Sequence, residues 1–136
     1  MFVSAELTAL DGTGADNQNW LAVMDAYANK EDPRDTFSQS GYLSAKYFVE
    51  TLMEMDPAKL DDRAAVTEAI KAINGKTSDL MCGPYYVGDA DRHMPNHAGI
   101  MVAIKGGKFE QVRDCFEYEG PYFAPLVEAE KVMSSK

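Results

Sequence analysis

The chain has 136 residues, of which 46% are hydrophobic and 26% charged, and its formal net charge at pH 7 is −9. This length suits one domain with a hydrophobic core, and the acidic balance argues against a nucleic-acid or anionic-membrane partner, because like charges repel. No apolar run approaches the roughly 20 residues of a membrane-spanning helix. The N-terminus lacks the basic start and apolar stretch of a signal peptide, which by itself indicates a cytosolic protein if residue 1 is the natural start.

The first part of the chain predicts a strand and two helices. Residues 1–10 alternate loosely between apolar and polar side chains and end in a turn signal, as an opening strand does. Asp16 is the expected N-cap of the first helix, and the second helix is expected from near Ser40 to Asp56-Pro57. The helical spacing of apolar residues predicts two buried faces: Trp20, Val23, Met24 and Tyr27 in the first helix, and Tyr42, Ala45, Phe48, Val49, Leu52 and Met53 in the second.

A third helix is expected after either Asp61 or Asp62, since both are suitable N-caps. Asn74-Gly75 is the expected stop signal at its C-terminal end. Its predicted buried face is Val66, Ala69, Ile70 and Ile73.

Beyond the third helix, residues 98–113 predict a β-hairpin. Apolar side chains alternate over 98–104, Gly106-Gly107 forms a turn, and residues 108–113 return. The tail, with two prolines and several aromatic side chains, is expected to pack irregularly and to end in a short charged helix or a frayed end. One strand, three helices and then a hairpin is the order of an α/β or α+β chain. The opening strand needs sheet partners, and the evident ones lie in this hairpin.

Five side chains of potential chemical interest lie close together in sequence: Cys82, Asp89, Asp91, His93 and His97. Pro95 between the histidines and Gly88 before them exclude the helical spacing of a zinc site, and no second Cys or His pair has ligand spacing, so no metal is expected. Gly83-Pro84 follows Cys82 directly and provides no helix N-terminus that would lower the thiol pKa. A structural cysteine is therefore favoured over a nucleophile, and the acidic pairs at 61–62 and 89–91 are explained by capping and turns.

The remaining motifs leave two questions open. Cys82 and Cys115 can pair in an oxidising compartment or remain two small buried hydrophobic residues, and their spacing does not decide. No G-x-G-x-x-G, P-loop or G-x-S-x-G motif is present, so no cofactor and no catalytic activity are expected. Among the aromatic residues, Phe37 lies in a polar connection ahead of a helix, where it covers either a neighbouring helix or a ligand.

Five segments of the chain matter in their joint order: FVSAEL, NWLAVMDAYANK, SQSGYLSAKYFVETL, DDRAAVTEAIKAI and LMCGPYYVGDADRHMPNHAGIMVAIKGGKFEQV. In this order they show a resemblance to the C-terminal part of type I periplasmic solute-binding proteins of the branched-chain amino acid (Leu/Ile/Val-binding) class, the receptors of ABC importers. It covers nearly the whole chain and depends on the joint order of these segments, since Gly-Pro and Gly-Gly-Lys are each common.

The resemblance implies a fold, a ligand and a location. Residues 1–136 would form a single domain, the C-terminal part of a two-lobe protein, with a Rossmann-like α/β lobe fragment of three helices, strands and a C-terminal β-hairpin. The full protein would bind an amino acid or a small carboxylate, aromatic ones included, in the cleft between its lobes and deliver it to a membrane permease. Its location would be periplasmic, with a signal peptide upstream of residue 1.

The resemblance also assigns residues. Phe37 occupies the place of an aromatic residue that covers the ligand side chain, and Tyr42 matches the leading tyrosine of the following helix, near the cleft or hinge. Gly83-Pro84 would mark a strand, and Cys82 and His93 would be structural, with the Asp/His stretch forming a solvent-facing turn. Open sheet edges and apolar patches would favour self-association.

Three alternatives remain open from the sequence. One is a cytosolic ligand-sensing regulator built from the same lobes. The second is a small enzyme that uses Cys82 with His93 or His97. The third is an interaction module without a small-molecule site.

Overall fold

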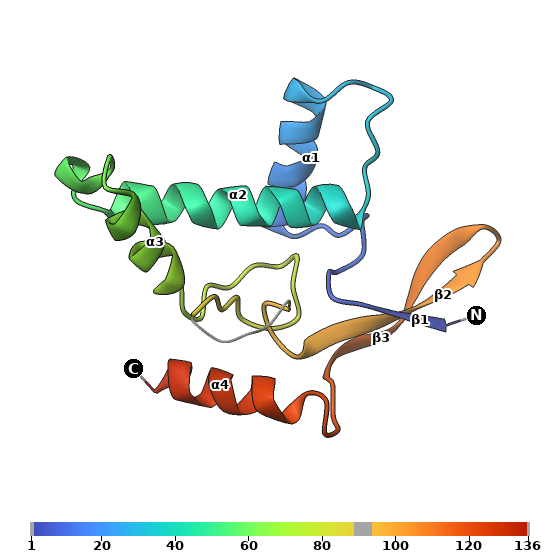
Figure 1. Ribbon diagram of the computed structural model, residues 1–136. Helices are drawn as coiled ribbons and strands as arrows, with labels where there is room; N and C mark the ends of the chain where they lie inside the picture. Colours follow the sequence, from blue (N-terminus) through green and yellow to red (C-terminus); the bar gives the residue numbers. More distant parts are fainter. Residues whose placement is uncertain (1, 89–93, 136) are drawn as a thin grey trace. The chain divides into compact units, whose positions relative to one another are not determined.

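The computed structural model describes residues 2–88 and 94–135. Within these residues the elements shown in Figure 1 are β1 (Phe2–Ala5), α1 (Ala15–Tyr27), α2 (Thr36–Glu54), the 3₁₀ helix η1 (Pro57–Lys59), α3 (Arg63–Lys71), β2 (Ala98–Lys105), β3 (Lys108–Glu117) and α4 (Ala124–Ser134). The predicted α/β class is confirmed. The tail forms a regular helix, α4.

The chain divides into two compact units. Unit 1 comprises residues 1–43, 78–83 and 98–118, and unit 2 comprises residues 44–77, 84–97 and 119–136. The division falls inside α2, so the N-terminal part of this helix belongs to unit 1 and the rest to unit 2. The expectation of one domain over residues 1–136 stays a prediction.

The described strands of unit 1 form an antiparallel sheet in the order β1-β2-β3. Phe2 lies opposite Ala103 in β2, so the opening strand pairs with the hairpin, as the sequence predicts. Gly106 and Gly107 both have positive φ, 56° and 77°, as a two-residue hairpin turn of this kind requires. The hairpin is therefore confirmed, and β3 continues beyond the predicted residue 113 to Glu117.

Apolar side chains from distant parts of the sequence make up the core of unit 1. Its most deeply buried apolar side chains are Trp20, Leu43, Leu80 and Ile100. β3, in contrast, is exposed along nearly its whole length. The sheet therefore contributes to the core chiefly through β2, its central strand.

Unit 2 contains the remainder of α2 together with α3 and α4. The Asp62 carboxylate accepts hydrogen bonds from the backbone N–H groups of Ala64 and Ala65, at 2.9 and 3.3 Å, so Asp62 is the N-cap of α3. Ile73 is buried and the rest of the predicted α3 face is half-buried, which confirms that face. The helix ends at Lys71, before the predicted Asn74-Gly75 stop.

The prediction for the start of α1 is wrong. Gly14 occupies the N-cap position and makes no side-chain cap, while Asp16 lies inside the first turn. The cap comes instead from Asp79, far along the chain, as described below. Of the four residues predicted to be buried, only Trp20 is fully buried, and Tyr27 is 87% exposed.

The predictions for α2 need two corrections. The helix begins at Thr36 rather than near Ser40, because Asp35 and Ser38 cap each other reciprocally. Its buried stripe is also different from the predicted apolar face: it consists of Gln39, Leu43, Tyr47 and Thr51. The two polar members can be buried because each donates a hydrogen bond, Gln39 to Asn17 and Thr51 to the Tyr47 carbonyl.

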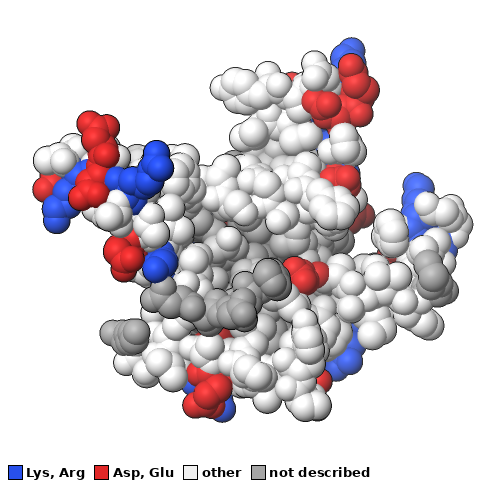
Figure 2. Space-filling view, in the orientation of Figure 1, with Lys and Arg blue, Asp and Glu red and all other residues white. Residues whose placement is uncertain are grey.

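As a result, the predicted apolar face of α2 is largely exposed. Phe48, Val49 and Met53 lie in unit 2 on this surface, and Met53 is 81% exposed. In Figure 2 the middle of α2 is a largely uncharged surface, whereas acidic and basic side chains are interspersed where α2 ends and α3 begins.

The expected strand at Gly83-Pro84 is wrong as well. In the described segment 76–87 the ladder contacts are isolated bridges, Leu7 with Met81 and Lys76 with Tyr85. Pro84 lacks a backbone N–H, so it has no donor with which to continue a ladder.

Candidate functional site

The N-terminal turn of α2 presents the aromatic residue that the sequence singles out. Phe37 is the second residue of the helix and its side chain is 85% exposed. Four residues on, Gly41 is exposed, and nothing lies within 4 Å of where its Cβ would be. An aromatic ring beside an open helix surface can cover an apolar group of a ligand or of a neighbouring element.

Tyr42, the second predicted ligand-binding residue, does not share this surface with Phe37. At 100° per residue in a helix, five residues separate the two side chains by about 140° around the axis. Tyr42 is half-buried, whereas Phe37 is exposed. The structure therefore brings the two residues onto one helix but not onto one side of it.

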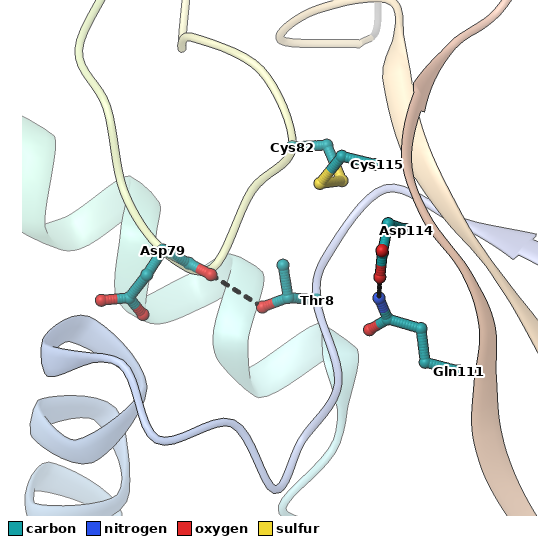
Figure 3. Close-up of a disulfide and its surroundings, with 6 residues drawn as sticks. All are labelled: Thr8, Asp79, Cys82, Gln111, Asp114 and Cys115. Carbon is teal, nitrogen blue, oxygen red and sulfur yellow. Dashed lines mark hydrogen bonds between the residues drawn. A yellow bond between two sulfur atoms is a disulfide. The ribbon is translucent and has the colours of Figure 1, made fainter.

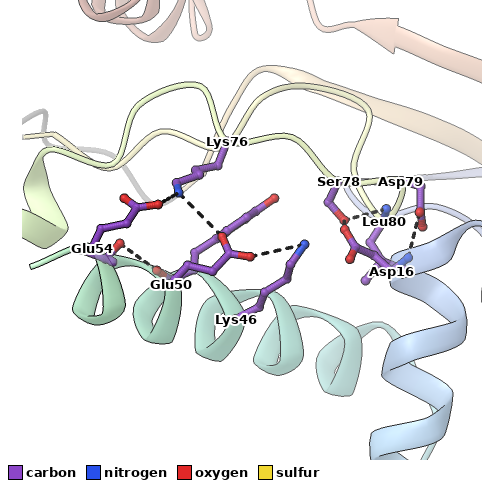
Figure 4. Close-up of polar contacts among 10 residues, drawn as sticks. Asp16, Lys46, Glu50, Glu54, Lys76, Ser78, Asp79 and Leu80 are labelled. Atoms are coloured by element: carbon purple, nitrogen blue, oxygen red, sulfur yellow. Dashed lines mark hydrogen bonds and ion pairs between the residues drawn. The ribbon is translucent and has the colours of Figure 1, made fainter.

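A hydrogen-bonded cluster in unit 1 holds the starts of α1 and α2, and the sequence did not reveal it. The Asp79 carboxylate accepts from the backbone N–H groups of Asp16, at 2.9 Å, and Asn17, at 3.1 Å, and so caps α1 (Figure 4). Ser78 Oγ donates to Asp16 Oδ2 at 2.6 Å. Asn17 Oδ1 in turn accepts from Gln39 Nε2 at 2.9 Å. Of the residues in this cluster, Gln39 alone had a signal in the sequence. It begins the i, i+4 spacing that ends at Thr51, and a search for apolar residues passes over that spacing because both ends are polar.

A disulfide between Cys82 and Cys115 joins the segment 78–83 to β3 (Figure 3). The same segment contacts the chain after β1, because Thr8 Oγ1 donates to the Asp79 carbonyl at 2.9 Å. Both cysteines of the chain are used in this bond and neither is free. The pairing left open by the sequence is thus resolved, and the free thiol that a Cys/His enzyme would need is not available.

The polar stretch 89–97 is described only in part. Asp89, Asp91 and His93 lie outside the described residues. His97 is not in a solvent-facing turn: its side chain is 16% exposed, and its Nδ1 lies 2.6 Å from Glu130 Oε2 in α4. This pair links the residues before β2 to the C-terminal helix of unit 2.

Unit 2 also carries a row of ion pairs along α2. Glu50 lies between Lys46, at 3.8 Å, and Lys76, at 3.7 Å, and Lys76 pairs with Glu54 at 3.0 Å (Figure 4). A groove of about 390 Å³ adjoins this row, lined by Thr51, Glu54, Met55, Ala69, Ala72, Ile73, Asn74 and Lys76. Its two charged residues neutralise each other, so the groove has no net charge with which to attract an ionic ligand.

The described residues offer neither a metal-binding cluster nor a membrane-spanning helix. They contain no group of three or more His, Cys, Asp or Glu side chains that could hold a metal ion. None of their helices is both long and apolar enough to cross a membrane.

Two of three comparisons with known proteins gave a match. A sequence model of the family described as periplasmic binding protein matches residues 1–108. The fold is similar to a solved structure of a branched chain amino acid ABC transporter from Thermus thermophilus with bound valine, with a TM-score of 0.63 and 15% sequence identity. The similarity covers 96% of this chain and 35% of that chain, so the chain spans about a third of the length of the solved structure. Comparison with curated proteins gave no match.

Proposed function

The chain belongs to the periplasmic binding protein family, and from this membership we propose that it is part of the solute-binding component of an ABC importer. The family match over residues 1–108 is the observation that carries the proposal. The predicted resemblance and the predicted fold, part of a type I periplasmic binding protein, are confirmed. Since the chain spans 35% of the solved structure, we propose that it forms the C-terminal part of a two-lobe protein that closes on its ligand by a hinge motion.

The proposed ligand is an amino acid or a related small carboxylate, held between the lobes of the natural full-length protein. The family match supports a solute ligand, and the solved structure of similar fold contains valine. Phe37, exposed at the start of α2, is the proposed contact with the ligand side chain. A ring without a hydroxyl group favours an apolar or aromatic ligand side chain. Tyr42 is proposed to pack near the cleft or hinge.

The proposed location is the periplasm, with a signal peptide encoded upstream of residue 1. The family supports this location, and the Cys82–Cys115 disulfide supports it independently, because such bonds persist in oxidising compartments. The disulfide also disfavours a cytosolic regulator with the same lobes, since cytosolic thiols are kept reduced. The family is one of solute-binding proteins, and we propose no catalytic role for any residue.

Two partners belong to the same proposal. The first is the membrane permease of the importer, inferred from the family. The second is another copy of this chain. Among the described strands β1 and β3 are edge strands that pair with β2 on one side only, and exposed apolar side chains lie on them and on α2: Phe2, Phe109, Val112, Phe48, Val49 and Met53. Sedimentation of the 136-residue chain as a monomer at high micromolar concentration would contradict self-association.

Isothermal titration of the natural full-length protein with L-valine, L-leucine and L-phenylalanine tests the ligand proposal. Binding of at least one of them is expected, and Phe37→Ala should weaken it about tenfold, as truncation of a central aromatic contact does. The matched control is Tyr27→Ala, since Tyr27 is 87% exposed on α1 and has no proposed ligand role. A change within about twofold for Phe37→Ala would remove Phe37 from the site.

A further inference from the structure

The first turn of α2 is held by two sets of hydrogen bonds. Asp35 Oδ1 accepts from the Ser38 backbone N–H at 2.9 Å, and the Asp35 backbone N–H donates to Ser38 Oγ at 3.0 Å. Gln39, the next residue, is fully buried, and its side-chain amide donates to Asn17 Oδ1 in α1 at 2.9 Å. The same turn is therefore fixed locally by its cap and at long range by the Asn17–Gln39 bond.

Asn17 is itself firmly held. Its side-chain amide donates to the carbonyl oxygens of Leu10, at 3.2 Å, and Gly12, at 2.6 Å. Its backbone N–H donates to Asp79 Oδ1 at 3.1 Å, and the residue is 1% exposed. A donor bonded to Asn17 Oδ1 is thus bonded to a fixed point in unit 1.

The side-chain amide of Gln39 has one of its polar atoms paired and the other unpaired. Among the described residues, Gln39 Oε1 is buried without a hydrogen-bond partner. A buried unpaired acceptor lowers stability, whereas the donated bond satisfies Asn17 Oδ1, which an apolar side chain at position 39 would leave unpaired. What the amide adds is direction, because a buried hydrogen bond selects one arrangement where apolar contacts tolerate several.

The direction of Gln39 determines the direction of Phe37. Two residues along a helix correspond to a rotation of about 200°, so a buried Gln39 places Phe37 on the opposite, outward side. We propose that Asn17 and Gln39 are positioning residues that aim the Phe37 ring, and that they thereby set the preference among ligand side chains. The proposal rests on the ligand contact proposed for Phe37.

A double-mutant cycle in the natural full-length protein tests this role. Gln39→Met removes the donor and nearly preserves volume, and Phe37→Ala removes the ring that it is proposed to aim. Gln39→Met should weaken L-leucine and L-phenylalanine binding by different factors, about fivefold to tenfold for the more affected ligand. In the Phe37→Ala background the same substitution should change either affinity less than about twofold.

The matched control is Thr51→Val, which removes a buried hydrogen bond from the same helix, from Thr51 Oγ1 to the Tyr47 carbonyl at 2.8 Å. It should lower stability and leave the ratio of the two affinities unchanged. A loss from Gln39→Met that is equal in both backgrounds would overturn the positioning role and leave the proposed function standing. If Phe37→Ala alone has no effect, the ligand contact is wrong and the positioning role falls with it.

A second variant covers the case in which Gln39→Met does not fold. In Gln39→Glu only the protonated carboxyl can donate to Asn17 Oδ1, and burial favours that neutral form. Affinity relative to the wild-type protein at the same pH should therefore recover between pH 8 and pH 5. An affinity that stays reduced at pH 5, where the buried carboxyl is protonated and can donate, would show that the donated hydrogen bond is irrelevant to binding, and would overturn the proposal.

Discussion

The helices α1 and α3 begin with similar backbone geometry but are capped in opposite ways. In α3 the cap is local, since Asp62 immediately precedes the helix and accepts from Ala64 and Ala65. In α1 the carboxylate comes from Asp79, which is 63 residues from Asp16 in sequence. The first kind of helix start depends only on neighbouring residues, whereas the second exists only once the unit around it has folded.

Gly14 shows how the chain accommodates the distant cap. Its φ of −66° is accessible to any residue, so conformational freedom does not explain the glycine. A Cβ at this position, however, would lie 2.3 Å from the Asp79 carboxyl carbon. The glycine is required for space: a larger residue would displace the carboxylate from the helix terminus.

The largest expected effect comes from removing the disulfide, which holds the segment that carries Asp79. The double substitution Cys82→Ser and Cys115→Ser should lower the free energy of unfolding by about 2–4 kcal/mol, because the cross-link restricts the unfolded chain. Urea denaturation measures the loss. Hydrogen exchange should quicken at the first amides of α1 and stay unchanged at those of α3. Equal loss of protection in α1 and α3 would contradict the claim that α1 depends on a distant cap and α3 on a local one.

Asp79→Ala should have the next largest effect, about 2 kcal/mol, at the upper end of the range for a lost N-cap, because two backbone N–H groups lose their acceptor. The amides of Asp16 and Asn17 should lose protection first. Asp11→Ala is the control, since Asp11 is an exposed acidic residue of the same unit. If that variant is destabilised equally, the effect of Asp79→Ala reflects charge and not capping.

Gly14→Ala should destabilise by about 1–2 kcal/mol, the cost of displacing the cap. In the Asp79→Ala background the same substitution should cost clearly less, because the space is then free and only the lower suitability of alanine than glycine at an N-cap remains. Thermal or urea unfolding of the wild-type protein, the two single variants and the double variant gives the coupling free energy between Gly14 and Asp79. Additive effects would mean that Gly14 and Asp79 do not interact.

The smallest of these effects is expected from Asp62→Ala, about 1 kcal/mol for the loss of a local N-cap. Here protection should fall at the start of α3 alone, which hydrogen exchange can show. Asp61→Ala, at the preceding residue, is the matched control and should change stability by less than about 0.5 kcal/mol. If Asp61→Ala lowers stability by a comparable amount, the loss in Asp62→Ala does not identify Asp62 as the N-cap of α3.

The same distinction explains what the sequence could predict. The hairpin, its Gly106-Gly107 turn and the α3 cap depend on adjacent residues, and all three are present as expected. The buried stripe of α2 could not be read from apolar spacing, because Gln39 and Thr51 become buriable only through the hydrogen bonds that folding provides. The ligand-binding roles of Phe37 and Tyr42 come from the family resemblance and stay predictions.

The sequence separation between α1 and the residue that caps it also affects the order of folding during synthesis. At a synthesis rate of about 5–20 residues per second, the 63 residues between Asp16 and Asp79 take about 3–13 seconds to appear. Asp62, in contrast, leaves the ribosome just ahead of α3. We therefore expect the N-cap of α1, although the helix is made first, to form later than that of α3, and hydrogen exchange on ribosome-stalled chains that end before and after Asp79 would show the first amides of α1 gaining protection only in the longer chains.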